Sequence, residues 1–198
     1  MPKTAIRSKK RTTKRTSAHA LARTAKAKAS GRAASPKDQF LHAFDKEHAT
    51  TVRLLRAFPA DKLHIKPHSR SKSAKDLAWV FAAEEGMTER ALTQGFDWTK
   101  PMPAAPQPPD SLDAIIAAYE AGHKRVADLV RKMPEAKLFE TIQFPVAPKT
   151  IGDMPKLDFL WLLLCDQIHH RGQLSVYVRL ADGKVPSIYG PTADEPWM

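Results

Sequence analysis

Cysteine and long apolar runs are scarce in this chain, and both scarcities limit its class. Its 198 residues include one cysteine, Cys165, which excludes an intramolecular disulfide and which we expect to be a buried, small apolar side chain. Even the apolar run 159–165 ends at Asp166, far short of the roughly 20 residues that span a bilayer. The N-terminus also lacks the apolar segment of a secretory signal. We therefore expect a cytoplasmic protein without a membrane partner.

Acidic residues are missing from the N-terminal segment. Residues 1–36 contain eleven lysines and arginines and no aspartate or glutamate, while the other 21 bases of the chain equal its 21 acids. The net charge of +11 therefore belongs to this segment, and the charge of residues 37–198 gives no reason to expect a polyanion-binding domain. Large apolar side chains are almost absent from residues 1–34, so they cannot bury enough surface to offset their ordering entropy. The sequence predicts a disordered tail over 1–34 and a folded domain over 35–198.

This basic tail is the basis of one functional hypothesis. Phosphates of DNA or RNA attract clustered cations with strong salt dependence and little sequence preference. A stress-associated, metal-free protein that binds nucleic acid through its tail is therefore the alternative to an enzyme. Such an acid-free, arginine-rich N-terminus also fits an organellar transit peptide. The candidate phosphate-binding residues are Lys9, Lys10, Arg11, Lys14 and Arg15.

Apolar residues then recur at three- and four-residue spacing in four stretches, which predicts four amphipathic helices. Ser73 with Asp76 three positions later is typical of a capping box, and Pro36 suits a first helical turn. A proline-rich loop occupies residues 99–110, and residues 138–146 indicate a short hairpin or an extended connection. The pattern favours an all-α four-helix bundle with long crossover loops and helices over 36–57, 73–95, 111–133 and 155–181.

Polar side chains form one stripe on the most apolar of these helices. Asp166, His170 and Gln173 stand at i, i+4 and i+7, and Tyr177 extends the stripe by another turn. Burial of these groups is costly unless they bind one another, water or a metal. Carboxylate and imidazole one turn apart can chelate a divalent cation. A structural hydrogen-bond network explains the same spacing.

Several segments resemble the DinB family, also described as DinB/YfiT-like metalloenzymes and as damage-inducible four-helix bundles. The resemblance covers residues 37–198 and is carried by the runs 169–179 (HHRGQLSVYVR), 184–191 (KVPSIYGP), 194–197 (DEPW) and 73–79 (SAKDLAW). It implies an up-down-down-up bundle, often a homodimer, with a divalent metal held by three histidines. Some relatives are thiol S-transferases that use low-molecular-weight thiols, and others are thiol-dependent isomerases.

The family's ligand positions are only partly kept in this chain. The second histidine of the family's H-x-x-x-H corresponds to His170, the first corresponds to Asp166, and the histidine of the second helix corresponds to Val80. The resemblance therefore implies either a bundle that has lost its metal or an altered site, completed by Glu84 or His48.

An altered site of this kind would suit zinc, nickel, iron or manganese. In it, Asp166 and His170 would bind the metal, and Gln173 or Tyr177 would orient the ligands. The leading hypothesis is a divalent-metal-dependent enzyme of the thiol-transferase type.

Overall fold

The computed structural model describes residues 34–104 and 106–198. The tail predicted to be disordered, residues 1–34, lies outside the described residues except for position 34, and so do its five candidate phosphate-binding residues. Within the described part of the chain, none of the helices has the length and apolar character needed to cross a membrane.

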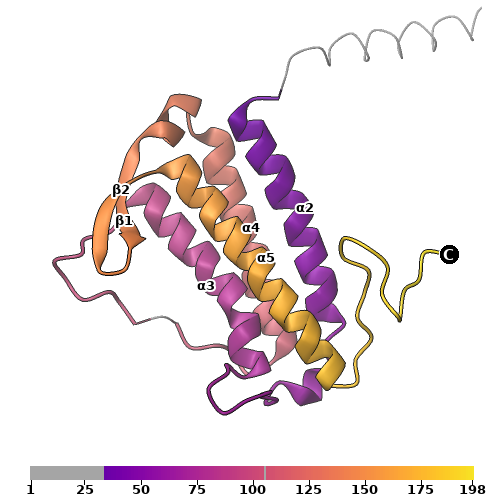
Figure 1. The fold of residues 1–198 in the computed structure, drawn as a ribbon. Helices are drawn as coiled ribbons and strands as arrows, with labels where there is room; N and C mark the ends of the chain where they lie inside the picture. Colours follow the sequence, from indigo (N-terminus) through magenta and orange to yellow (C-terminus); the bar gives the residue numbers. More distant parts are fainter. Residues whose placement is uncertain (1–33, 105) are drawn as a thin grey trace, which may run out of the picture. The chain divides into compact units, whose positions relative to one another are not determined.

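Four long helices make up most of the fold, as the periodicity predicts (Figure 1). Ser73 begins the second of them with a capping box, in which its hydroxyl accepts from the Asp76 amide and its own amide donates to the Asp76 carboxylate. Ser111 caps the third by accepting from the Ala114 amide at 3.2 Å. The helices are α2 (Pro36–Arg56), α3 (Ala74–Thr93), α4 (Leu112–Lys132) and α5 (Lys156–Leu180).

Helices α2 and α5 run in one direction and α3 and α4 in the other (Figure 1). Lys75 at the start of α3 pairs with Asp110 at the start of α4 at 2.8 Å, so these two starts lie together. Lys37 at the start of α2 donates to the Met133 carbonyl at the end of α4. Helix α3 packs on α4 and α5, and so does α2. This order is the up-down-down-up bundle that the resemblance implies.

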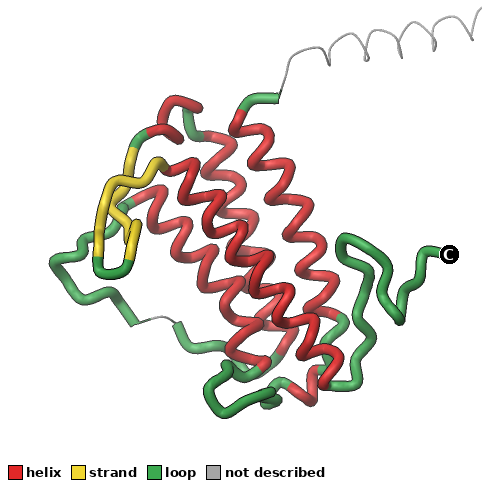
Figure 2. Tube along the Cα trace, viewed as in Figure 1, coloured by secondary structure: helices red, strands yellow, loops and turns green. Residues whose placement is uncertain are grey.

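A small sheet corrects the all-α expectation (Figure 2). Strands β1 (Thr141–Ala147) and β2 (Thr150–Pro155) pair antiparallel after a short 3-10 helix (Glu135–Phe139). Ile142 and Phe144 alternate on one face and pack in a cluster with Phe159 of α5. The sequence indicated only the first strand, because Gly152, Asp153 and Pro155 give the second no strand pattern.

The bundle interior is apolar but contains a group of polar side chains. Leu160, Leu164, Leu174 and Val178 bury one side of α5 in the core, while Leu162 and Val176 on its outer side are exposed. Buried polar groups are costly without partners, so we expect these polar side chains to bind one another or a ligand. The buried polar residues in the described part of the chain are Thr51, Glu84, Glu85, Thr88, His123, Gln167 and Arg171.

Candidate metal centre

Three side chains from two packed helices converge at one point of the bundle. Asp166 and His170 stand one turn apart on α5, and Glu84 reaches them from α3. The Nε2 atom of His170 lies 3.6 Å from Oδ2 of Asp166 and 3.8 Å from Oε1 of Glu84. One ligand atom from each residue lies within 4.8 Å of the others, and residues 34–104 and 106–198 hold no second such group.

These separations fit a divalent transition metal. Zinc bound to nitrogen and carboxylate oxygen in tetrahedral geometry places its ligand atoms roughly 3.4 Å apart. The observed distances of 3.6 and 3.8 Å need only a small closing motion to reach that value. One imidazole with two carboxylates suits zinc, iron, manganese or nickel and leaves coordination positions for water or substrate.

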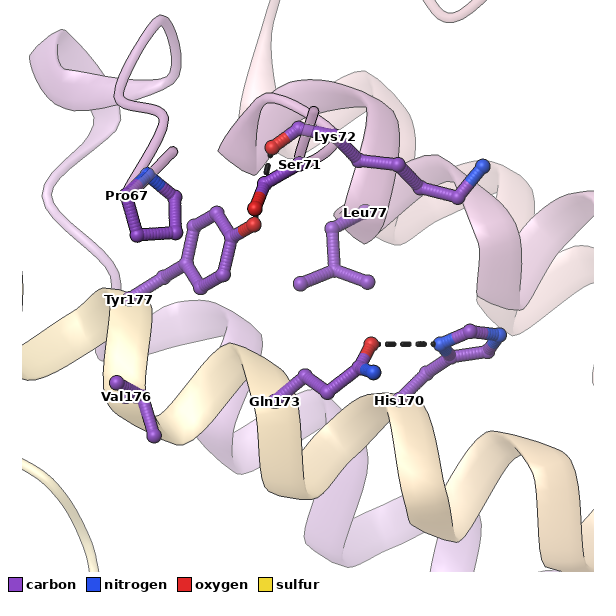
Figure 3. A pocket seen from close by; sticks show the side chains of 8 residues that line it. All are labelled: Pro67, Ser71, Lys72, Leu77, His170, Gln173, Val176 and Tyr177. Atoms are coloured by element: carbon purple, nitrogen blue, oxygen red, sulfur yellow. Dashed lines mark hydrogen bonds between the residues drawn. The ribbon is translucent and has the colours of Figure 1, made fainter. Parts of the chain in front are cut away.

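The imidazole of His170 is oriented by a neighbour. Its Nδ1 lies 3.0 Å from Oε1 of Gln173 (Figure 3). The amide nitrogen of Gln173 lies 2.9 Å from Nε2 of His169. In the tautomer that donates from Nδ1 to this amide oxygen, Nε2 of His170 would present its lone pair to the carboxylates. Gln173 thus lies where the sequence analysis expects an orienting residue, while the Tyr177 hydroxyl donates elsewhere, to the Lys72 carbonyl at 3.0 Å.

Glu84 is the most perturbed member of this cluster. Its side chain is 7% exposed, and its Oε2 atom is buried without a hydrogen-bond partner. Burial, followed by the neighbouring carboxylates of Asp166 and Glu85, raises the pKa of Glu84 to about 9. Without a cation, Glu84 therefore holds a proton at neutral pH. A divalent ion would reverse this preference, because its charge stabilises the carboxylate.

A second group of polar side chains lies next to the candidate ligands, and the sequence did not predict it. Gln167 donates to Oε1 of Glu85 at 3.2 Å and accepts from the Tyr119 hydroxyl at 2.9 Å. Burial also raises the pKa of Glu85 to about 8. Glu85 and Gln167 each follow a ligand by one residue, which turns them about 100° around their helices and off the stripe. The available signal was the pair of consecutive glutamates within the apolar helix α3.

His48, the other residue expected to complete the site, is not a member of the group. Its ring stacks on His123 with centroids 3.8 Å apart, and its Nε2 is buried without a partner. Burial and the neighbouring His123 lower the pKa of His48 to about 4. His123 in turn lies 3.0 Å from Asp45 through its Nε2. The structure therefore brings Glu84, rather than His48, to Asp166 and His170.

Val80 and Glu84 are one turn apart on α3, so they share a face of that helix. Val80 is half-buried and offers no donor atom to a metal. Glu84, one turn further along, supplies a carboxylate on the same face as the position that the resemblance assigns to histidine.

Two hollows open beside the cluster. The first, of about 430 Å³, contains His170 and Gln173, and the second, of about 480 Å³, contains Asp166 and His169. Cys165 lines the second hollow and is exposed, which corrects its expected burial. Small molecules could therefore reach His170 from one hollow and Asp166 from the other.

Comparisons with known proteins agree with this architecture. The chain is 32% identical over 161 residues to the uncharacterized protein YrdA of Bacillus subtilis (strain 168), covering 80% of this chain and 90% of that protein. It resembles the crystal structure of a DinB-like protein from Bacillus cereus, with a TM-score of 0.62, 22% identity, and coverage of 76% of this chain and 95% of that one. A DinB-like protein from Bacillus subtilis has a TM-score of 0.59 at 18% identity, with coverage of 81% and 99%. The DinB family model matches residues 26–197. The chain thus belongs to the DinB family.

Proposed function

We propose that this protein is a divalent-metal-dependent enzyme whose metal is held by Glu84, Asp166 and His170. The observation that carries the proposal is the convergence of their three ligand atoms within 4.8 Å, with Nε2 of His170 facing both carboxylates. A cation bound there would act as a Lewis acid that lowers the pKa of a coordinated thiol or water. Binding requires Glu84 to give up its proton, so metal affinity rises with pH.

Transfer of a low-molecular-weight thiol to an electrophile is the activity we propose for this centre. The support is analogy with thiol-dependent members of the family, together with two hollows that could receive two reactants beside one cluster. In this role Gln173 keeps the His170 ring in place, and the apolar side chains that line both hollows provide a packing surface for the reactants.

Metal analysis tests the first part of the proposal. Untagged, chelator-treated protein is titrated with Zn²⁺, Ni²⁺, Mn²⁺ and Fe²⁺, and we expect one equivalent to bind. Asp166→Asn and His170→Gln should lose the site, whereas His64→Gln, in an exposed loop position, should keep it. Retention of less than about a tenth of an equivalent of every metal would overturn the proposal.

A direct assay tests the second part. The loaded protein is mixed with a small thiol and an aryl halide, and loss of free thiol is followed with and without chelator. Metal-dependent loss that disappears in His170→Gln supports transfer. Full metal occupancy without thiol loss would keep the metal site and remove the transferase assignment.

Nucleic-acid binding by the basic tail is a second proposal, carried by the eleven bases and absent acids of residues 1–36. Deletion of residues 1–34 should abolish a low-salt gel shift of duplex DNA or RNA, because the remaining chain is formally neutral. Unchanged binding would refute it.

A homodimer is likewise proposed from the family resemblance, and light scattering of the purified protein measures it.

A further inference from the structure

The hollow that contains His170 has the features of a subsite for a small organic molecule. It encloses about 430 Å³ between the segment that leads into α3 and the outer face of α5. That volume lies within the range of small-molecule sites. Figure 3 shows His170 and Gln173 along one side and the Tyr177 ring at the far end. Its apolar walls are Pro67, Leu77, Val176 and the Tyr177 ring.

The described residues that line this hollow include one lysine, Lys72. Lys72 lines it and forms no salt bridge within residues 34–104 and 106–198, and its side chain extends over the hollow toward the end where His170 lies (Figure 3). The acid that feels its charge, Asp76, is bound by the Ser73 hydroxyl at 2.6 Å in the cap of α3. Among the described residues, no aspartate or glutamate lines the hollow. The carboxylates of Asp166 and Glu84 lie against His170, where the proposed metal would offset their charge, so Lys72 is the charged group that an anion in the hollow would meet.

The position of Lys72 is tied to the candidate metal centre. Its carbonyl accepts a hydrogen bond from the Tyr177 hydroxyl at 3.0 Å, and Tyr177 stands two turns after His170 on α5. The Tyr177 hydroxyl thus fastens the Lys72 segment to the helix that carries two of the three ligands. This contact holds the backbone of Lys72 against α5 and so keeps its side chain within reach of the hollow.

We propose that this hollow binds a small organic anion. Its carboxylate or phosphate pairs with Lys72 at the end of the hollow where His170 lies, and its apolar body packs on Leu77, Val176 and Tyr177. The assignment of this anion as a substrate rests on the metal-dependent function proposed above, because only then does chemistry occur at the His170 end.

Matched probes test the subsite on the metal-loaded full chain. Phenylbutyrate, its neutral amide phenylbutanamide, and phenylethyl phosphate are titrated by calorimetry, with amide chemical shifts of Ser71, Leu77 and Gln173 as the local readout. We expect the anions to bind about fivefold more tightly than the neutral amide, the value of one exposed ion pair. The carboxylate and phosphate arms show which head group the hollow prefers.

Three variants identify the cause of that preference. Lys72→Met should bring the anion-to-amide ratio to about one while leaving metal affinity unchanged. Lys75→Met removes a neighbouring lysine that pairs with Asp110 outside this hollow, and should keep the preference. Val176→Asp places a carboxylate on an exposed wall position and should weaken anion binding without disturbing the fold.

The outcomes separate the two proposals. If the protein binds metal but its preference for anions survives Lys72→Met, the subsite is refuted and the metal centre is not. The same holds if the chemical shifts of the three reporting amides do not change on titration. Absence of metal overturns the proposed function and, with it, the substrate assignment of the anion. Metal binding together with a preference lost only in Lys72→Met and Val176→Asp supports both.

Discussion

Replacement of Glu84 by glutamine should stabilise the metal-free protein while removing its metal site. Burial raises the pKa of Glu84 from 4.5 to about 9, so the folded state keeps a proton that the unfolded state releases. A raised pKa of this kind leaves stability intact below pH 4.5 and reduces it progressively as the pH rises toward 9. Glutamine has no such proton, so the variant escapes this loss.

The magnitude at neutral pH follows from the same shift. At about 1.4 kcal/mol for each pH unit above 4.5, the loss at pH 7 is up to about 3 kcal/mol. Glu84→Gln should therefore gain up to about 3 kcal/mol at pH 7, or about 6 to 12 °C in Tm for a domain of this size. At pH 5 the same slope leaves a gain of less than about 1 kcal/mol. Glu85 titrates in both proteins, and because its carboxylate acts on Glu84, the difference between the proteins measures Glu84 together with this coupling.

Urea unfolding of chelator-treated protein at pH 5, 6, 7 and 8 measures this difference. Glu89→Gln, on the same helix and paired with the exposed Arg125, is the matched control and should show no growth of the difference with pH. Parallel pH profiles for the parent and Glu84→Gln would refute the reasoning. Saturating metal should then reverse the order, because it stabilises only the protein that binds it.

Three further predictions concern neighbouring positions. Val80→His adds an imidazole on the face of Glu84 and should lower the Kd for Zn²⁺ by at least about tenfold, measured by competition with a chelating dye. His48 has a pKa lowered to about 4, so in the unfolded state it takes up a proton at a higher pH than in the folded state. Its contribution to stability should therefore fall as the pH drops from 6.5 toward 4, by up to about 3 kcal/mol, against the opposite contribution of Glu84. His48→Phe should flatten this acid limb in urea titrations, and an unchanged limb would contradict the role of His48. Arg171 is 1% exposed and pairs with Glu47 at 2.5 Å, so Arg171→Met should cost about 3 to 5 kcal/mol in urea unfolding. Arg53→Met, which breaks the exposed pair with Glu195, should cost far less, and equal losses would count against a special role for the buried pair.

Local sequence patterns were sufficient to predict the helices and half of the candidate metal site. Ser73 with Asp76 marked the start of α3, and the spacing of Asp166, His170 and Gln173 placed all three on one stripe of α5. Such features depend only on helical geometry, which repeats every 3.6 residues whatever the surroundings. The hairpin was only partly visible, since a strand such as β2 gains its stability from pairing with β1 and not from its own residues.

The choice between Glu84 and His48 as the third ligand could not be read from the sequence. Both stand on amphipathic helices at positions that could face the interior, and helical periodicity does not say which neighbouring helix each one meets. Packing decided it, because α3 brings Glu84 to α5 whereas His48 on α2 stacks against His123 of α4. The sequence by itself determined the bundle, the polar stripe on α5 and the absence of the family histidine at Val80. Only the tertiary structure joined that stripe to a buried carboxylate and placed Lys72 across a hollow from it, since contacts between distant segments arise from packing.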